Sequence, residues 1–272
     1  MFDVRYSLHP SLSYPELRVV GPSTESDSLA PAVMLCPGGG YISTQEKEIE
    51  FIVLQFLARG YTCFILYHGV EAPFAQMPQP IEALYTAFKY IEQIAPSYGV
   101  DIRRLRLMGW STGAHLITQS FCLHQVERYA SFKELNIHSI CLLYPVLDLK
   151  TLLPFSGMEM TFTALSGRRT PPDTFWSQYS YCKPTKGLPP VCIVEYQNDP
   201  FLPAATLTDY LLGLKENDIR YLLITIPDKK HGDPRFSTLH NNELSLHKSD
   251  ELSHITISSN YLDQYLLWDS QL

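Results

Sequence analysis

The sequence lacks an excess of positive charge. Its 21 Lys and Arg residues are outnumbered by 28 Asp and Glu residues, which gives a formal net charge of −7 over 272 residues. Because proteins that bind nucleic acid present basic surfaces, this balance argues against nucleic acid as the main partner. The charge says nothing specific about a substrate.

Long apolar runs are also missing. No uninterrupted apolar stretch approaches the roughly 18 residues of a membrane span. Residues 1–11 (MFDVRYSLHPS) contain no basic segment followed by a long apolar run, which a signal peptide would have. We therefore expect a soluble protein with no membrane partner and a cytoplasmic location.

The cysteines form neither a C-x-x-C pair nor the dense spacing of a disulfide-rich domain. Most of them stand inside apolar runs, so we expect buried, reduced thiols, as in a cytoplasmic protein. The six are Cys36, Cys63, Cys122, Cys141, Cys182 and Cys192.

The chain is long enough for one large α/β domain over residues 1–272, and it has no internal repeat or low-complexity segment. Continuous apolar runs alternate with amphipathic stretches, a pattern that predicts a mostly parallel sheet with helices on both faces. The expected strands are 3–8, 17–20, 32–36, 62–67, 105–108, 139–144, 191–196 and 220–226. The expected helices are 46–59, 81–98, 202–217 and 260–272.

Two segments are less regular. Residues 148–187 are rich in Pro, Thr, Ser and aromatic residues, and we interpret them as an irregular, cap-like excursion over the top of the sheet. Residues 233–259 are polar and rich in histidine, with few apolar anchors. They fit an irregular insertion that serves as a lid, an oligomer contact or a loop.

The most informative stretch is Gly109-Trp110-Ser111-Thr112-Gly113, which joins an apolar run to a helix-like pattern. This is the arrangement of a nucleophile elbow, in which glycines flank a serine held in a strained turn. Ser111 would stand at a helix N-terminus, where free N–H groups favour developing negative charge. A glycine turn that contains a serine by chance is the alternative.

A serine nucleophile needs a base, and the base needs an orienting acid. Asp199 follows the predicted strand 191–196, and His231 follows the strand 220–226, so both stand where parallel strands end. Other Asp, Glu and His residues are weaker candidates. Some have a simpler explanation in helix capping, a turn, a position within a strand or packing, and others do not follow a predicted strand. The weaker candidates are Asp148, Glu195, Asp228, Asp233, His115, His240, His247 and His254.

Hydrolysis through a serine also needs N–H donors for the oxyanion. The N–H of Thr112, directly after the serine, supplies one. The loop Pro37-Gly38-Gly39-Gly40 suits the others, because glycine lets the backbone approach a ligand closely. The same loop lacks the G-K-[ST] ending of a phosphate-binding P-loop and the glycine spacing of a dinucleotide fingerprint.

With these motifs the chain resembles α/β-hydrolase carboxylesterases of the acetyl-xylan/feruloyl esterase-like kind, over roughly residues 30 to 232. The resemblance implies an α/β-hydrolase fold, a Ser111–Asp199–His231 triad, an oxyanion hole of Gly38, Gly39 and Thr112, and ester hydrolysis without metal or cofactor. The matching residues are Pro37–Tyr41, Tyr67, Pro78, Pro80, Tyr98–Asp101, Gly109–Leu116, Tyr144-Pro145, Asp199, Pro203 and His231-Gly232.

Three features depart from the family pattern. The elbow reads S-T-G-A-H where S-A-G-G-H is usual, and the oxyanion loop begins with Pro37 where many relatives have histidine. Both changes leave the mechanism intact but narrow the pocket. The segment after His231 is longer than expected, which bears on substrate access.

We therefore expect a serine carboxylesterase for short acyl groups, such as acetyl esters of sugars, with a small-molecule ester as partner. Amide cleavage on the same triad, as in an arylformamidase or peptidase, and a non-catalytic binding protein are the alternatives, and a homodimer is left open. Aromatic residues of the cap are expected either to line the acyl or alcohol side of the site or, for most of them, to belong to the core. They are Phe162, Phe175, Trp176, Tyr179 and Tyr181.

Overall fold

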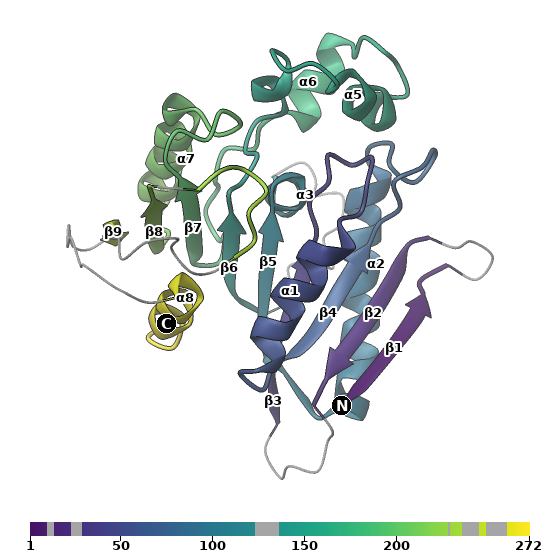
Figure 1. Cartoon of the computed structure of the whole chain (residues 1–272), viewed down its shortest axis with the longest axis vertical. Coiled ribbons are helices and arrows are strands. Elements are labelled where there is room, and N and C mark those ends of the chain that lie inside the picture. The colour runs from purple at the N-terminus through teal and green to yellow at the C-terminus, as the bar shows by residue number, and fades with distance from the viewer. Residues whose placement is uncertain (10–13, 23–28, 123–135, 228, 236–244, 249–259) are drawn as a thin grey trace.

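A computed structural model describes residues 1–9, 14–22, 29–122, 136–227, 229–235, 245–248 and 260–272. These residues contain a nine-stranded sheet in the order β1-β2-β4-β3-β5-β6-β7-β8-β9 (Figure 1). The strands are β1 (Phe2–Ser7), β2 (Glu16–Gly21), β3 (Ala30–Cys36), β4 (Thr62–Tyr67), β5 (Val100–Trp110), β6 (Ile137–Leu143), β7 (Val191–Tyr196), β8 (Tyr221–Ile226) and β9 (Ser245–Lys248).

The centre of the sheet is parallel. The strands β4, β3, β5, β6, β7 and β8 run in one direction, and β1, β2 and β9 add antiparallel pairs at the two edges. Every residue of β4 is buried, as a strand covered on both faces requires. The prediction of a mostly parallel sheet is confirmed. The strand β9 falls inside the segment expected to be irregular.

Helices cover both faces of the sheet (Figure 1). α1 (Glu46–Leu57) and α8 (Tyr261–Asp269) pack their apolar residues on one face, together with buried side chains such as Val33 and Cys141. α2 (Gln79–Ile94), α3 (Thr112–Ser120) and α7 (Ala204–Glu216) pack on the other, with Met34 and Leu142. Adjacent residues of one strand therefore belong to different cores, as the two-residue period of a strand dictates.

Local sequence accounts for the helix boundaries. The buried Ile81, Leu84, Phe88 and Ile91 recur at helical spacing along α2. The predicted helix 81–98 ends in a short 3₁₀ helix, η1 (Ala95–Tyr98). Gly99 then takes a left-handed conformation, with φ of 61°, and β5 begins at the next residue. β5 is longer at its beginning than the apolar pattern indicates, because residues 101–104, three of which are charged, are still extended.

The cap is more regular than predicted. Residues 148–187 contain the 3₁₀ helix η3 (Leu149–Leu152) and two short helices, α5 (Glu159–Ser166) and α6 (Asp173–Tyr179). The latter two lie above the carboxyl ends of the parallel strands (Figure 1). These helices were not predicted, because helices of two turns carry too few residues to display a clear period.

The expectation of six reduced cysteines is wrong for one pair. Cys122, just after α3, and Cys182, just after α6, form a disulfide with Cα atoms 5.6 Å apart. The other four cysteines are free and buried. Nothing in the sequence marks this pair, since 60 residues separate its members.

Two features of the remaining chain bear on the earlier expectations. Most of the segment 233–259 lies outside the described residues, and so do Asp228, His240 and His254. Within the described ranges, no helix combines the length and the apolar character that crossing a membrane requires.

Candidate active site

The elbow after β5 holds Ser111 in the conformation that its motif predicts. Ser111 has φ of 53° and ψ of −124°, a strained region for a residue with a side chain. Glycine is required on both sides. A Cβ atom on Gly109 would lie 2.6 Å from the carbonyl oxygen of Gly113, and one on Gly113 would lie 1.9 Å from that of Cys36. The G-x-S-x-G spacing is therefore a packing requirement of this turn.

Three side chains from separate strand ends meet at the elbow. Ser111 Oγ lies 2.7 Å from His231 Nε2, and His231 Nδ1 lies 2.7 Å from Asp199 Oδ2. The Asp199 side chain is fully buried, and its Oδ1 accepts a 2.9 Å bond from the N–H of Phe201. A carboxylate held in this way fixes His231 with its Nδ1 protonated, so Nε2 is free to accept the serine proton.

Two aromatic rings fix the position of the imidazole. The rings of Phe201 and Tyr144 meet His231 edge-on, with centroids at 4.6 Å and 5.1 Å. Behind His231, the side chain of Lys229 is buried against the rings of Tyr196 and Tyr261. Burial lowers the pKa of Lys229 to about 8. The loop that carries His231 is thus tied to both β7 and α8.

The glycine loop lies against the elbow. A Cβ atom on Gly38 would stand 2.7 Å from the carbonyl oxygen of Trp110, so only glycine allows this approach. Across the described chain, the N–H groups of Gly38, Gly39 and Thr112 have no acceptor, whereas that of Gly40 donates to Thr112 Oγ1 at 2.9 Å. Free N–H groups beside a nucleophile suit an oxyanion.

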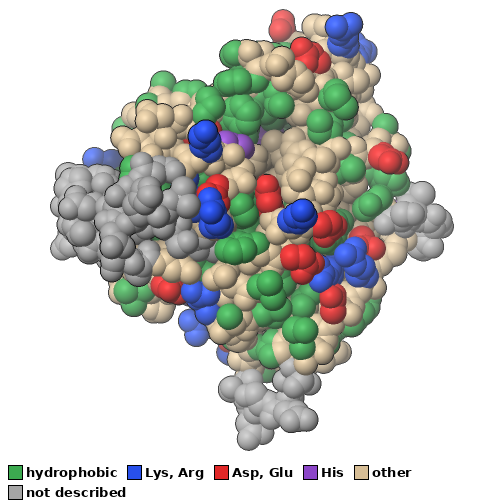
Figure 2. Space-filling model, in the orientation of Figure 1, with side chains coloured by type: hydrophobic (Ala, Val, Ile, Leu, Met, Phe, Trp, Pro, Cys, Tyr) green, Lys and Arg blue, Asp and Glu red, His purple; other side chains and the backbone are tan. Residues whose placement is uncertain are grey.

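A cavity of about 310 Å³ opens at Ser111. Its walls come from the glycine loop, the elbow, the His231 loop and the cap, with Leu152, Met158 and Thr161 as the cap's contribution. Figure 2 shows a histidine exposed in a hollow below the cap helices. None of the five aromatic residues predicted to line the site does so, although all five are described. Phe162 and Phe175 are buried in the core instead, and the other three pack against it.

Sequence reasoning missed several polar residues of this cavity, among them Glu48 and Thr161. Glu48 is in the first turn of α1, and its Oε2 accepts a 3.0 Å bond from Trp110 Nε1. Burial raises the pKa of Glu48, an effect opposed by the Trp110 hydrogen bond and by His231. The helix that follows the glycine loop starts at the carboxyl edge of the sheet, which is the signal that could have drawn attention to Glu48.

The alternative candidates have other roles or lie elsewhere. His115 is buried beneath the elbow between Tyr41 Oη and the carbonyl oxygen of Tyr179, each 2.9 Å away, and burial lowers its pKa to about 4. Asp148 caps η3 by accepting from the N–H of Lys150. Glu195 lies within β7 and accepts from Thr225 Oγ1, and Asp233 pairs with Arg235. His247 is in the edge strand β9.

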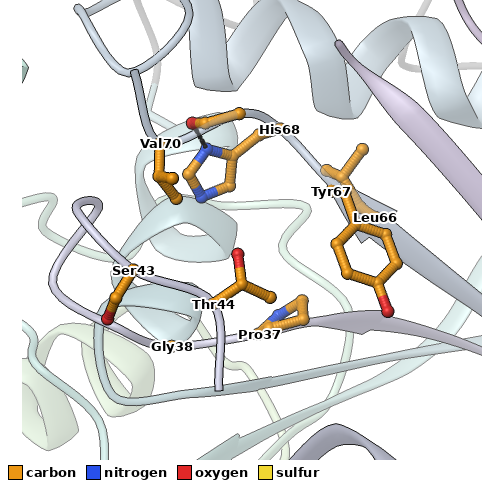
Figure 3. Close-up of a pocket in the computed structure, with 9 residues that line it drawn as sticks. Pro37, Gly38, Ser43, Thr44, Leu66, Tyr67, His68 and Val70 are labelled. Atoms are coloured by element: carbon orange, nitrogen blue, oxygen red, sulfur yellow. Dashed lines mark hydrogen bonds between the residues drawn. The ribbon is translucent and has the colours of Figure 1, made fainter. Parts of the chain in front are cut away.

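A second, much smaller cavity lies beside the start of the glycine loop. It measures about 10 Å³ and is lined by Gly38, Thr44 and His68, among others. His68 points into it, and its Nδ1 donates to the carbonyl oxygen of Gly69 at 2.7 Å (Figure 3). A space of this size holds a single water molecule, so it is not a substrate site. No cluster of metal-ligating side chains occurs in the part of the chain that the structure describes.

Comparison with known proteins adds a family assignment to this geometry. The family model described as BD-FAE, a family of α/β-hydrolase esterases, matches residues 17–210, more than half of the chain. The endo-1,4-β-xylanase B of Butyrivibrio fibrisolvens is 25% identical over 210 residues. The acetylxylan esterase of Xylanibacter ruminicola is 21% identical over 205 residues.

The matched region covers 74% of this chain in both cases, but only 32% and 40% of the two relatives, so the chain spans about a third of their length. Among solved structures, a sugar hydrolase from Lactococcus lactis is similar in fold, with a TM-score of 0.70 at 19% identity. That likeness covers 99% of this chain and 96% of the other. The predicted α/β-hydrolase fold is confirmed.

Proposed function

Because the chain belongs to the BD-FAE family of α/β-hydrolase esterases, we propose that it is a serine carboxylesterase that cleaves short acyl esters of sugars or similar small alcohols. The observation that carries the proposal is the continuous chain of two 2.7 Å contacts from Ser111 through His231 to Asp199. The names of the two curated relatives, a xylanase and an acetylxylan esterase, favour acetylated sugars as substrates.

In the proposed reaction, Ser111 Oγ attacks the ester carbonyl while His231 Nε2 takes its proton. The oxyanion accepts hydrogen bonds from the N–H groups of Gly38, Gly39 and Thr112. Collapse of the tetrahedral intermediate releases the alcohol, which takes the proton back from His231, and leaves an acyl group on Ser111. Water, deprotonated by His231, then attacks the acyl group. The acid is released as Ser111 Oγ takes the proton from His231. Asp199 orients His231 and stabilises its charged form throughout.

The size of the cavity favours short acyl groups. At about 310 Å³ it stands at the lower end of small-molecule sites, and a sugar ester fills most of such a volume. Leu152 and Met158 line it on the cap side. A long acyl chain would extend beyond this volume.

The test is hydrolysis of p-nitrophenyl acetate and its longer-chain homologues by the purified protein, beside Ser111→Ala. We expect kcat/KM to fall with acyl length, and Ser111→Ala to lower kcat on the acetate by at least about 10⁴-fold. Ser97→Ala is the control, because Ser97 is exposed in η1, before the start of β5 and away from the elbow. We expect it to behave as the wild type.

Equal background rates for the wild type and Ser111→Ala would exclude esterase activity. The same panel with acyl anilides then tests amide cleavage on the same three residues. Inactivity on both panels would leave a non-catalytic binding role.

A further inference from the structure

Glu48 stands on the side of the site where the alcohol of an ester must lie. His231 returns its proton to the leaving oxygen, so the alcohol part of the substrate is on the His231 side of the scissile bond. A Cβ atom built on Gly232, the next residue, would be 4.0 Å from Glu48 Oε1. A positive charge on His231 would lower the pKa of that carboxylate.

The Glu48 carboxylate is held in place but keeps one oxygen available. Trp110 Nε1 donates to Oε2 at 3.0 Å, which fixes the plane of the carboxylate. Over the described residues, Oε1 has no hydrogen-bond partner, and Glu48 lines the cavity at Ser111. An oriented acceptor without a partner in a small-molecule site fits a donor on the ligand.

Two further polar atoms of residues that line the cavity have no partner within the described chain. Thr161 Oγ1, on the cap helix α5, is fully buried, and within the described chain it has no hydrogen-bond partner. It lies close to Gly40 of the glycine loop and lines the same cavity. The hydroxyl of Tyr144, another lining residue, is also buried and unpartnered there. Both hydroxyl oxygens are shielded from solvent, so the acceptor offered to a ligand is Glu48 Oε1.

We propose that Glu48 determines specificity by accepting a hydrogen bond from a hydroxyl group next to the ester, so that the site selects esters of polyhydroxylated alcohols over those of plain alcohols. This inference rests on the proposed esterase function and adds the residue that recognises the alcohol part of the ester. The carboxylate also disfavours substrates whose alcohol part is anionic.

The experiment compares two acetate esters of similar size. One is a mono-O-acetylated methyl xyloside with free neighbouring hydroxyls, and the other is cyclohexyl acetate, which has a ring but no hydroxyl. The quantity measured is the ratio of the two kcat/KM values for the wild type, Glu48→Ala and Glu48→Gln. Because the same nucleophile and base act on both esters, the ratio reports on recognition of the alcohol.

We expect the wild type to prefer the xyloside ester and Glu48→Ala to lower the ratio about 10- to 100-fold, as for the loss of a hydrogen bond to a charged group. Glu48→Gln keeps the shape and an oxygen for Trp110, so a smaller fall is expected. It serves as the readout if the alanine variant does not fold. Glu92→Gln, which removes an exposed carboxylate on α2 at the other face of the sheet, controls for the change in net charge.

Two results would overturn the inference alone: a wild-type ratio of one or less, or ratios for the Glu48 variants that match that of Glu92→Gln. In either case, hydrolysis of cyclohexyl acetate by the wild type would still support the proposed esterase function. If the wild type hydrolyses neither ester, the proposed function fails and this inference fails with it.

Discussion

At the scale of single residues, Thr112 has two roles in this site. Its N–H is a predicted oxyanion donor, and its hydroxyl accepts the N–H of Gly40 at 2.9 Å. That bond ties the glycine loop to the elbow, so the donors on both segments keep a fixed separation. The usual alanine of the family at this position could not form it. The departure noted in the sequence thus adds a positioning contact.

Thr112→Ala should therefore lower kcat by about 10-fold, because oxyanion stabilisation depends on donors held in place before the reaction. KM should change little, since the substrate's ground state does not depend on this alignment. Thr112→Ser keeps the hydroxyl and should restore most of the rate. Steady-state kinetics on p-nitrophenyl acetate measures all three proteins. A serine variant as slow as the alanine variant would contradict this role of the hydroxyl.

At the scale of elements, α8 is anchored to the sheet by a buried ion pair. Asp269 accepts from Nε of Arg106 on β5 at 2.7 Å, and also from Arg106 Nη2 and Ser139 Oγ. The Arg106 and Asp269 side chains are 3% and 0% exposed. By contrast, Asp263 on the same helix pairs with Arg59 at the surface, with its own side chain 51% exposed.

The two aspartates form a matched pair for a stability measurement. Asp269→Ala leaves the charge of Arg106 buried without a partner and should lower the free energy of unfolding by about 3–5 kcal/mol. Asp263→Ala removes a solvent-exposed pair and should cost about 0.2–1 kcal/mol. Urea unfolding of both variants at neutral pH tests this. Similar losses for the two would mean that the buried pair does not anchor α8.

The elements themselves were largely predictable. The runs TCFILY and VCIVEY match β4 and β7 residue for residue, because a strand buried on both faces has an unbroken apolar sequence. The order of strands was not predictable, since it depends on contacts between distant segments. The short cap helices, and with them the position of Thr161, were not predicted for a related reason. Two turns of helix gain their stability from tertiary packing rather than from a local period.

Some residues of the candidate site could be predicted from local sequence, and others could not. Ser111, Asp199 and His231 were found because each follows a strand or interrupts the chain with a glycine motif, which is local information. Glu48 was not found, because it is one of several charged residues in an amphipathic helix and nothing in the neighbouring sequence distinguishes it. Only the placement of α1 against the elbow singles it out. The role of each of these residues in a reaction is still a prediction.

At the scale of the whole molecule, acid should destabilise the fold through His115. Burial lowers the pKa of this histidine to about 4, below its ordinary 6.5. The unfolded chain therefore takes up a proton at higher pH than the folded one. The contribution to stability is complete above about pH 6.5 and is lost as the pH falls through about 4. It amounts to at most about 3 kcal/mol.

The prediction can be checked by urea unfolding at about pH 7.5 and about pH 4.5. We expect His115→Gln to lose less stability between these values than the wild type, because glutamine does not titrate. Its amide can still bond to Tyr41 and to the carbonyl oxygen of Tyr179. His9→Gln, at an exposed position, should follow the wild type. If all three proteins showed the same pH dependence, another group would be responsible.

The proposed triad is spread over three loops, after β5, β7 and β8, and 120 positions separate Ser111 from His231. During synthesis the nucleophile and its elbow emerge first, the acid later and the base last. A nascent chain that ends after β7 would carry a strained serine with no base beside it. With the proposed triad, ester chemistry would have to wait until the loop after β8 has been made and has folded back onto the sheet.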